Sequence, residues 1–588
     1  MKRQHRIALA ALICVMMHRI VECFDNNKWT HKSITLIVIC FFTIPFVYAT
    51  EVAAGKTIIS KNKTDIDDQT FISQYWKEQE IIFNTMYPGN LFYPGDIVTA
   101  NVHITPCPLK TTKQLRAYIK VFDAYNREVA PIQQISLNEE NGFAGLVNLP
   151  GKPGYYQVEI VVSDETNKNS METRYAVIPA HFSKGINLSS PFGVNTHFNQ
   201  GWSSKIGEIV KRSGIAWIRD GEAGPGDKAA QVAKDNDLCY MACFTAWRKK
   251  LADKFRETLK KDPDFNRQWD YAEQIKWHQE YTKKYHNYVH AYDIMNEPHG
   301  TWGAVLGGSW RGGQWLVTFA DYAKHISRII RKADPGEPII WEDIDRLMWY
   351  DDFHKYNVAD FIDVISPHTY NLHRKNPYPE DQPTIAQQDE WLNFLRKHNL
   401  SWQIWSGEVG FSSYELNPDN PSMFYSPHTE LHQANMLVRM MVVQLAWGVK
   451  RIFWYDFMND GWNINNPEHN FGIIRKDQLP KPAIVAYAYL IYRFKNIKTL
   501  IRFNIKPKDN VFAYCIMKEG QKEPTLIIWA KEGQETVDLF IVSNITKVAV
   551  TNIFGTSLEP ISAVNHNLHL ILKESPIYIE GFTIQDLR

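Results

Sequence analysis

The stretch HAYDIMNEPH, residues 290–299, is mainly apolar in its centre and ends in polar and charged residues. A short apolar run with such an end is typical of a strand that is buried on both faces. Seven further segments repeat this pattern, and they begin at Phe192, Ile215, Leu238, Pro338, Asp363, Trp402 and Arg451. The sequence therefore predicts eight parallel strands within one domain.

Amphipathic helical patterns separate these strands. Residues 316–334, LVTFADYAKHISRIIRKAD, precede the fifth strand, and residues 431–448, LHQANMLVRMMVVQLAWG, precede the eighth. Alternation of this kind predicts a (β/α)8 TIM barrel of the α/β class over residues 185–494. Because active sites of such barrels lie at the carboxyl ends of the strands, we expect the polar residues that end the strands to meet at one mouth.

The barrel is flanked by two regions with a different periodicity. In residues 80–184, apolar positions such as Val98, Ala100 and Val102 alternate with polar ones, which predicts an immunoglobulin-like β-sandwich. Short strand patterns return over residues 495–588 and predict a C-terminal β-sandwich.

The N-terminus has the pattern of a targeting sequence. Basic residues precede two apolar runs within residues 1–49, and the second run, ITLIVICFFTIPFVYA, ends at Ala49. We expect a signal peptide cleaved after Ala49, with an uncleaved membrane anchor as the alternative. Residues 50–79 are polar and predict a linker. Both alternatives place the rest of the chain in a secreted, cell-surface or periplasmic location, with membrane contact only if the leader is uncleaved.

Composition narrows the classes of partner. The chain has 65 Lys and Arg against 64 Asp and Glu, so it lacks the basic excess of a nucleic-acid-binding protein. Aromatic residues make up 13% of the chain and include 19 tryptophans, which suit the flat apolar faces of sugar rings. Cysteine spacing indicates neither a disulfide framework nor a metal site. We expect a carbohydrate partner, no nucleic acid, no metal and no cofactor.

Two glutamates end the fourth and seventh predicted strands. Glu297 and Glu408 would face each other across the barrel mouth, and two carboxyl groups suffice to cleave a glycosidic bond. Glu342 and Asp343, at the end of the fifth strand, are the alternative candidates for the catalytic carboxylates. The sequence does not show which sugar or linkage is cleaved or whether cleavage is endo or exo. It does not show the oligomeric state either.

The motifs around the two glutamates resemble a known group of enzymes. YDIMNEPHG, residues 292–300, and WSGEVGFSS, residues 405–413, look like signatures of clan A of the glycoside hydrolases, which are retaining barrel enzymes. The outline is similar to family 39, and family 5 is the alternative. The resemblance implies that Glu297 is the acid/base and Glu408 the nucleophile. It predicts a retaining hydrolase of β-linked, or equatorial, oligo- or polysaccharides.

The resemblance also implies supporting roles at other strand ends. Arg219 and Tyr370 would hydrogen-bond Glu408, and Asn296 would contact the sugar 2-hydroxyl. We expect the charge of Glu408 to raise the pKa of Glu297, which lets Glu297 act first as an acid. Pro298 should hold Glu297 in an extended backbone conformation.

Several aromatic and histidine residues are candidates for substrate contacts. Trp454 is the candidate platform under the sugar, with a core role as the alternative. His197 and His368 would touch sugar hydroxyls or orient other groups. Some of four loop tryptophans should line further subsites: Trp202, Trp247, Trp302 and Trp462. Two alternative functions remain open for a chain with this barrel. It could be a carbohydrate-binding protein without activity or a transglycosylase.

Overall fold

The computed structural model describes residues 79–582 apart from several internal segments. The segments outside the description are 106–114, 138–142, 165–166, 182–184, 222–223, 225, 245–271, 300–315, 345, 371–377, 382–387, 418–424, 506–508, 522 and 541–544. The predicted leader, residues 1–49, lies outside the described residues, as does the predicted linker, residues 50–79, except for Gln79. Trp247 and Trp302 lie outside them as well.

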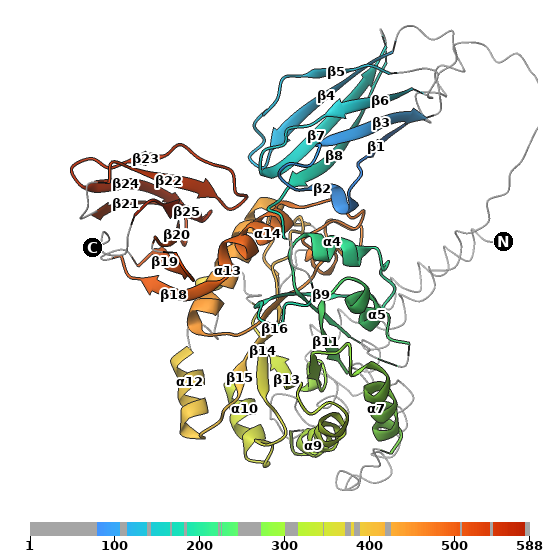
Figure 1. Ribbon diagram of the computed structural model, residues 1–588, viewed down its shortest axis with the longest axis vertical. Coiled ribbons are helices and arrows are strands. Elements are labelled where there is room, and N and C mark those ends of the chain that lie inside the picture. Colours follow the sequence, from blue (N-terminus) through green and yellow to red (C-terminus); the bar gives the residue numbers. More distant parts are fainter. Residues whose placement is uncertain are drawn as a thin grey trace, which may run out of the picture. The chain divides into compact units, whose positions relative to one another are not determined.

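The central sheet is a barrel of parallel strands (Figure 1). The strands are β9 (Phe192–Thr196), β10 (Trp217–Asp220), β11 (Cys239–Cys243), β12 (Ala291–Asp293), β13 (Ile339–Ile344), β14 (Val364–His368), β15 (Gln403–Ile404), β16 (Ser406–Val409) and β17 (Ile452–Trp454). Strands β15 and β16 are two pieces of the predicted seventh strand. Because β15 pairs with β14 while β16 pairs with β17, and β17 pairs with β9, the sheet closes on itself. The TIM-barrel prediction is confirmed.

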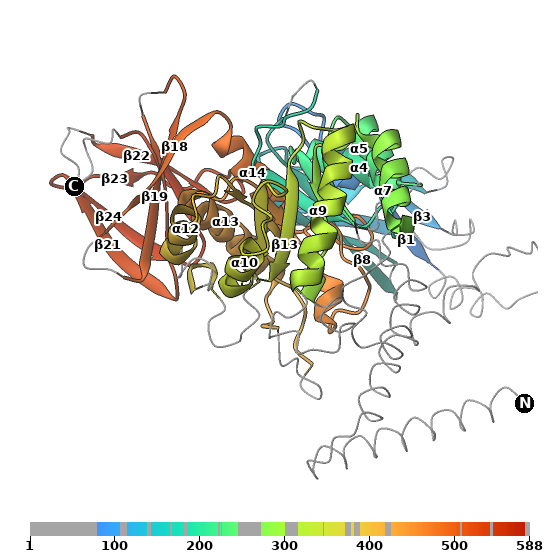
Figure 2. The same cartoon turned by 90° about the horizontal axis from the view of Figure 1, so that it is seen from below.

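Helices cover the outside of the barrel, and Figure 2 shows α9 running along it next to α7. They are α4 (Ile206–Arg212), α5 (Lys228–Asp235), α7 (Ala272–Tyr285), α9 (Leu316–Ala333), α10 (Leu347–His354), α12 (Gln388–Lys397), α13 (Glu430–Trp447) and α14 (Pro482–Phe494). Helix α13 begins where the Thr429 hydroxyl accepts the His432 N–H at 3.1 Å, and it ends at Gly448, whose φ of 113° suits glycine.

Aromatic residues close the amino-terminal end of the barrel. Trp217, Trp405 and Phe453 belong to one buried cluster inside it. The guanidinium of Arg451 lies 4.5 Å from the Trp217 ring and 4.3 Å from the Trp405 ring. These large side chains fill the barrel interior, so polar chemistry is confined to the opposite, carboxyl end.

The N-terminal region is all β, as its period-two pattern predicts. Its strands are β1 (Glu80–Asn84), β2 (Leu91–Phe92), β3 (Thr99–Thr105), β4 (Arg116–Asp123), β5 (Gln133–Ile135), β6 (Ala144–Asn148), β7 (Gly154–Ser163) and β8 (Lys168–Val177), with the short helix η1 (Pro88–Asn90) after β1. They form sheets of three and five strands. Val102 of β3 and Val158 of β7 share one buried cluster, so the two sheets enclose a common core.

The C-terminal region is also all β. Its strands are β18 (Ile497–Phe503), β19 (Val511–Lys518), β20 (Thr525–Ala530), β21 (Gln534–Phe540), β22 (Lys547–Asn552), β23 (Ile561–Ser562), β24 (Asn567–Lys573) and β25 (Ile577–Glu580). Val550 of β22 and Leu570 of β24 lie in the same buried cluster, although they belong to different sheets. This region therefore has a core of its own.

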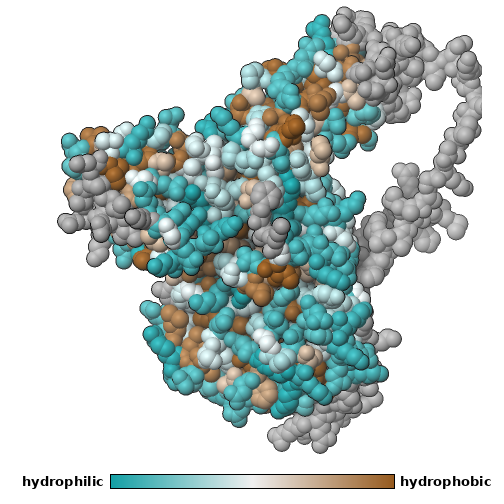
Figure 3. All heavy atoms as spheres, viewed as in Figure 1, coloured by the Kyte–Doolittle hydropathy of each residue, from teal (hydrophilic) through white to brown (hydrophobic). Residues whose placement is uncertain are grey.

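The face of the molecule in Figure 3 is largely hydrophilic, with apolar residues gathered in several small patches. Among the described helices, none combines the length and the apolar composition needed to cross a membrane.

Candidate active site

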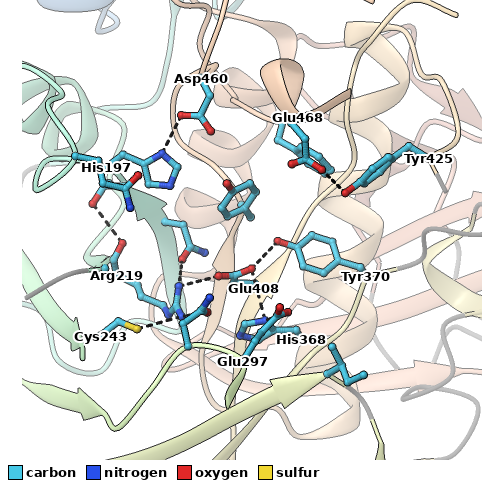
Figure 4. A pocket seen from close by; sticks show the side chains of 18 residues that line it. His197, Arg219, Cys243, Glu297, His368, Tyr370, Glu408, Tyr425, Asp460 and Glu468 are labelled. Carbon is cyan, nitrogen blue, oxygen red and sulfur yellow. Dashed lines mark hydrogen bonds and ion pairs between the residues drawn. The ribbon is translucent and has the colours of Figure 1, made fainter. Parts of the chain in front are cut away.

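A cavity of about 740 Å³ opens at the carboxyl ends of the barrel strands (Figure 4). Polar side chains from most of the strand ends converge on it, as predicted. Its lining comprises Asn195, Thr196, His197, Gln200, Arg219, Gly221, Cys243, Asn296, Glu297, Ile344, His368, Tyr370, Glu408, Tyr425, Tyr455, Asp460, Glu468 and Phe471. The predicted catalytic and supporting residues all line this cavity except Trp454, and the loop residues Trp202 and Trp462 are not part of its lining either.

Glu408 lies in β16 and is held at both carboxylate oxygens. Arg219 Nη1 donates to Oε1 at 2.9 Å, and the Tyr370 hydroxyl donates to Oε2 at 2.9 Å. Only 12% of the Glu408 side chain is exposed, so little water competes with these two donors. The carboxylate is therefore fixed in one orientation toward the cavity.

Glu297 follows β12 and faces Glu408 across the mouth. Its Oε1 lies 2.9 Å from Nδ1 of His368, and the same nitrogen lies 3.5 Å from Oε2 of Glu408. One oxygen of each glutamate and one nitrogen of His368 all lie within 4.8 Å of one another. The structure thus brings together two carboxylates that are separated by more than a hundred residues in the sequence.

The backbone of Glu297 differs from the prediction. Its φ is +40°, in the left-handed region, whereas the following Pro298 predicts an extended conformation. This region costs a residue other than glycine about 1–2 kcal/mol, and strain of this kind persists only where surrounding contacts maintain it. The His368 contact and the hydrogen bond from Met295 N to Asp293 Oδ1, at 3.1 Å, are two such contacts.

Arg219 is the central cation of the site. It is 4% exposed, and its Nη atoms donate to Oδ1 of Asn195 and Oδ1 of Asn296, each at 2.8 Å. It also contacts Glu342 and, at 3.4 Å, Asp293. Burial raises the pKa of Asp293 to about 6, although Arg219 acts in the opposite direction. One guanidinium therefore faces several acidic groups at once.

The alternative candidate carboxylates lie behind the cavity wall. Glu342 is fully buried, and its Oε1 lies 3.4 Å from Nε2 of His368. Asp343 is also fully buried and pairs with His299. Neither side chain lines the cavity, so neither is placed to meet a substrate directly.

His368 shifts the protonation of Glu297 in the direction opposite to our prediction. Burial acts to raise the pKa of Glu297, but the hydrogen bond and positive charge of His368 outweigh burial, and the net pKa is lowered. The expectation of a raised pKa counted burial in the pocket and the charge of Glu408. It missed the imidazole of His368, whose Nδ1 lies 2.9 Å from Oε1 of Glu297.

His197 forms a second charged pair at the rim. Its Nδ1 lies 2.8 Å from Oδ1 of Asp460. Burial lowers the pKa of His197, but the hydrogen bond to Asp460 and the charge of Asp456 together raise it to about 9. His197 is therefore a cation at neutral pH and donates its Nδ1 proton to Asp460.

The prediction that Trp454 forms a platform in the cavity is wrong. Trp454 is fully buried, its ring stacks on Phe411 at 6.2 Å, and its Nε1 donates to the Phe471 carbonyl at 3.4 Å. Successive side chains of a strand point to opposite faces, and it is the next residue, Tyr455, that lines the cavity. The Tyr455 ring lies 5.6 Å from that of Phe471 and 6.3 Å from that of Tyr370, which makes an aromatic wall.

Sequence reasoning missed several other lining residues. Tyr455 was within reach, because it directly follows the eighth strand. Tyr425, Glu468 and Phe471 come from long connections without periodicity, and no sequence signal marked them. Tyr425 donates its hydroxyl proton to Glu468, which joins two of these connections over the cavity.

Among the residues that the structure describes, three groups of side chains have the spacing to hold a metal ion. They are His197, Asp456 and Asp460; Cys243, Asp293 and Glu342; and Glu297, His368 and Glu408. In each group an organic cation already stands beside the carboxylates. Arg219 contacts Asp293 and Glu342, and the histidine nitrogens contact the acids of the other two groups.

No protein family profile and no curated protein matches this sequence. Among solved structures, the chain is similar to a family 39 glycoside hydrolase from Bacteroides cellulosilyticus WH2, with a TM-score of 0.62 and 17% identity over 85% of this chain and 99% of that one. The chain therefore shares the fold of that enzyme, a TIM barrel with flanking β-rich regions.

Two weaker similarities involve other glycoside hydrolases. A GH30 endoxylanase from Clostridium papyrosolvens C71 has a TM-score of 0.41 and 12% identity over 68% of this chain and 97% of that one. A β-glucuronidase from Bacteroides uniformis has a TM-score of 0.38 and 12% identity over 86% of this chain and 60% of that one. Scores this low carry no argument about activity.

Proposed function

We propose that the chain is a retaining glycoside hydrolase that cleaves a β-linked, or equatorial, oligo- or polysaccharide by double displacement. The observation that carries the proposal is the proximity of Glu297 and Glu408, with one oxygen of each within 4.8 Å. Retaining enzymes hold their carboxyl groups about 5 to 5.5 Å apart, whereas inverting enzymes need about 6.5 to 9.5 Å to admit a water. The spacing supports a covalent intermediate.

In the first step, Glu408 attacks the anomeric carbon while the bond from that carbon to the leaving oxygen breaks. The leaving oxygen takes a proton from Glu297. Because His368 lowers the pKa of Glu297, this proton belongs to the Glu297–His368 pair, in which Nδ1 of His368 can return it to Glu297. Arg219 and Tyr370 aim the attacking carboxylate.

In the second step, a water molecule attacks the anomeric carbon and displaces Glu408, which leaves as a carboxylate. Glu297 now accepts the proton of that water, so the acid of the first step becomes the base of the second. The two inversions leave the anomeric configuration unchanged. Asn296, whose Oδ1 is occupied by Arg219, has its amide nitrogen available for the sugar 2-hydroxyl. Tyr455 takes the platform role predicted for Trp454.

A nucleophile variant tests this mechanism. Glu408→Ala should abolish turnover of an aryl β-glycoside, and azide should restore part of it, because a small anion can occupy the vacated position. Proton NMR of fresh wild-type product should show retained configuration. Glu208→Ala, on the exposed face of α4, is the matched control and should keep full activity. An inverted product would falsify the double displacement.

Product analysis separates the other two functions. A panel of xylan, mixed-linkage β-glucan, galactomannan and chitosan is incubated with enzyme, and new reducing ends are measured. A binding protein that has lost activity would release none, and a transglycosylase would yield chains longer than the substrate. We expect new reducing ends and shorter chains.

We also propose that the protein is exported, on the basis of the apolar runs and basic residues in residues 1–49. Cell fractionation followed by N-terminal sequencing tests this. Signal-peptide cleavage predicts a mature chain that begins at Thr50, and an intact N-terminus in the membrane fraction would instead indicate an anchor.

A further inference from the structure

A second hollow, of about 620 Å³, lies next to the loop of residues 460–470. Trp462 lines it and is 72% exposed. Ser413, Glu415, Asn470 and Arg475 supply polar groups around the same hollow. A tryptophan with most of its surface in water contributes little to the core, so its position is better explained by something that it contacts from solution.

The loop that carries Trp462 is held in one conformation by its own hydrogen bonds. Asn470 Nδ2 donates to the carbonyls of Asn463, at 2.9 Å, and Asn466, at 2.8 Å. The Glu415 N–H donates to the Ile464 carbonyl at 2.8 Å, which ties the loop to the connection that follows β16. Trp462 is therefore presented from a fixed backbone, and binding through it requires little ordering of the chain.

A buried lysine fixes the base of this loop. Lys481 is 1% exposed, and its Nζ donates to Oδ1 of Asn459 at 2.7 Å and to the carbonyls of Asn470, at 3.2 Å, and Gly472. It also donates to Oγ of Ser413 at 3.0 Å. One ammonium group thus joins both ends of the loop to the connection after β16.

The loop has two sides with different functions. Asp460 and Glu468 line the active-site cavity, whereas Trp462 and Ile464 line the second hollow. The two hollows therefore share one wall. Among the loop tryptophans of the described chain, Trp202 is 6% exposed and packs in the core, so Trp462 is the one that faces solvent.

We propose that Trp462 and the second hollow bind a further sugar residue of the chain that is cleaved in the neighbouring cavity. The indole face would stack on the C–H groups of the sugar, while Glu415 and Arg475 would meet its hydroxyls. The inference rests on the proposed function for its substrate class. With this second site, the enzyme would bind the polymer on both sides of the loop of residues 460–470.

The test compares long and short substrates. Trp462→Ala should raise KM for the polysaccharide that the wild type cleaves fastest in the panel by about tenfold, the loss expected when one stacked aromatic ring is removed. The kcat/KM for an aryl monosaccharide, which cannot reach past the wall, should stay within about twofold of wild type. Phe540→Ala removes an exposed aromatic ring in the C-terminal sandwich and should change neither value.

Direct binding gives a second readout that does not require turnover. In the Glu408→Ala background, affinity gel electrophoresis against the same polysaccharides measures retardation with and without Trp462. We expect Trp462→Ala to abolish most of the retardation. Unchanged retardation and unchanged polymer KM would overturn the inference, as would an equal loss of activity on polymer and aryl monosaccharide in a variant whose melting temperature is unaltered.

The two proposals fail in different ways. If the wild type cleaves the panel but Trp462→Ala behaves as wild type, the second binding site is wrong and the hydrolase remains. If the wild type cleaves nothing but retardation depends on Trp462, the hydrolase is wrong and the binding site remains.

Discussion

Tyr370 and Arg219 each supply one hydrogen bond to Glu408, and the two bonds reach different oxygens. Arg219 also contacts Asn195 and Asn296, so replacing it would disturb much of the site. Tyr370 contacts Glu408 through its hydroxyl, so its replacement by phenylalanine removes that hydrogen bond and keeps the ring. Its pKa is raised well above the usual range by burial and by the charge of Glu408, so the hydroxyl remains a donor.

Tyr370→Phe should lower kcat/KM for an aryl β-glycoside by about tenfold to a hundredfold, because a hydrogen bond to a charged group contributes about 1.5–3 kcal/mol. Steady-state kinetics measures the effect. Tyr492→Phe, at an exposed tyrosine of α14, is the control and should retain wild-type kinetics. Equal kinetics for Tyr370→Phe and wild type would show that Glu408 needs no second donor.

The pairing of Glu297 with His368 sets a pH dependence. Burial acts to lower the pKa of His368, but the charge of Glu408 and the hydrogen bond to Glu297 raise it, so the pair keeps its shared proton to higher pH than a lone carboxyl would. In the His368→Asn variant only Glu297 can hold this proton, so the alkaline limb of the kcat/KM profile should move to lower pH, with a lower maximum. His569→Asn, at an exposed histidine, should leave the profile in place. A shift toward higher pH would contradict the shared proton.

At this scale, sequence could predict the residues that end strands and little about their surroundings. Arg219 and Glu408 lie near the ends of buried strands, and Glu297 and Tyr370 follow such strands; barrel geometry brings these positions together. Trp454 was misplaced by one residue, because the point at which β17 ends decides which neighbour faces the cavity. The lowered pKa of Glu297 depends on side-chain distances that no spacing in the sequence encodes.

At the scale of secondary-structure elements, one fully buried ion pair helps to join three elements. Arg439 of α13 donates to Oε1 of Glu380 at 2.8 Å, in the short helix η5 (Pro379–Asp381), and both side chains are fully buried. Trp529 of β20 donates to the same carboxylate at 2.8 Å. The connection after the sixth barrel strand is thereby fastened to a helix and to the C-terminal sandwich.

Arg439→Met should lower the free energy of unfolding by about 3–5 kcal/mol, because it leaves a buried carboxylate without its cation. Urea unfolding monitored by circular dichroism gives the value. Lys120→Met removes the cation of a partly exposed surface pair with Glu159 and should cost much less than Arg439→Met. Similar losses in both variants would mean that the Glu380 carboxylate finds another partner.

The elements themselves were well predicted where their periodicity is strong. Each of the eight apolar segments contains a barrel strand, because burial on both faces leaves a clear run of hydrophobic residues. The division of the seventh strand into β15 and β16 was not predicted, because a break in hydrogen bonding leaves the apolar pattern intact. The loop of residues 460–470, fixed by asparagines and Lys481, has no period and could not be folded from sequence.

In the molecule as a whole, one hydrophobic core extends from the barrel into the C-terminal region. Tyr489 of α14 packs against Tyr578 of β25 with ring centroids 5.3 Å apart, and Trp529 belongs to the same cluster as the barrel helices. Arg493 of α14 pairs with Glu580 at 2.6 Å. The barrel therefore relies on its neighbour for part of its own packing.

Deleting residues 497–588 should leave the barrel without a cooperative thermal transition, because the buried face of α14 would become exposed to water. Differential scanning calorimetry tests this. The point variant Trp529→Ala should itself cost about 3–5 kcal/mol of stability, whereas Phe540→Ala on the exposed side of β21 should cost little. A truncated barrel that melts cooperatively at the wild-type temperature would show that the shared core is dispensable.

The aromatic cluster of Trp217, Trp405 and Phe453 fills the barrel interior beneath the cavity, so among the described residues the cavity is reached from the carboxyl ends of the strands. Under the proposed mechanism, the departing part of the polymer, the incoming water and the released sugar would all pass through this mouth. A saccharide that stays there would then slow the attack of water on the ester at Glu408, and product inhibition is the expected consequence.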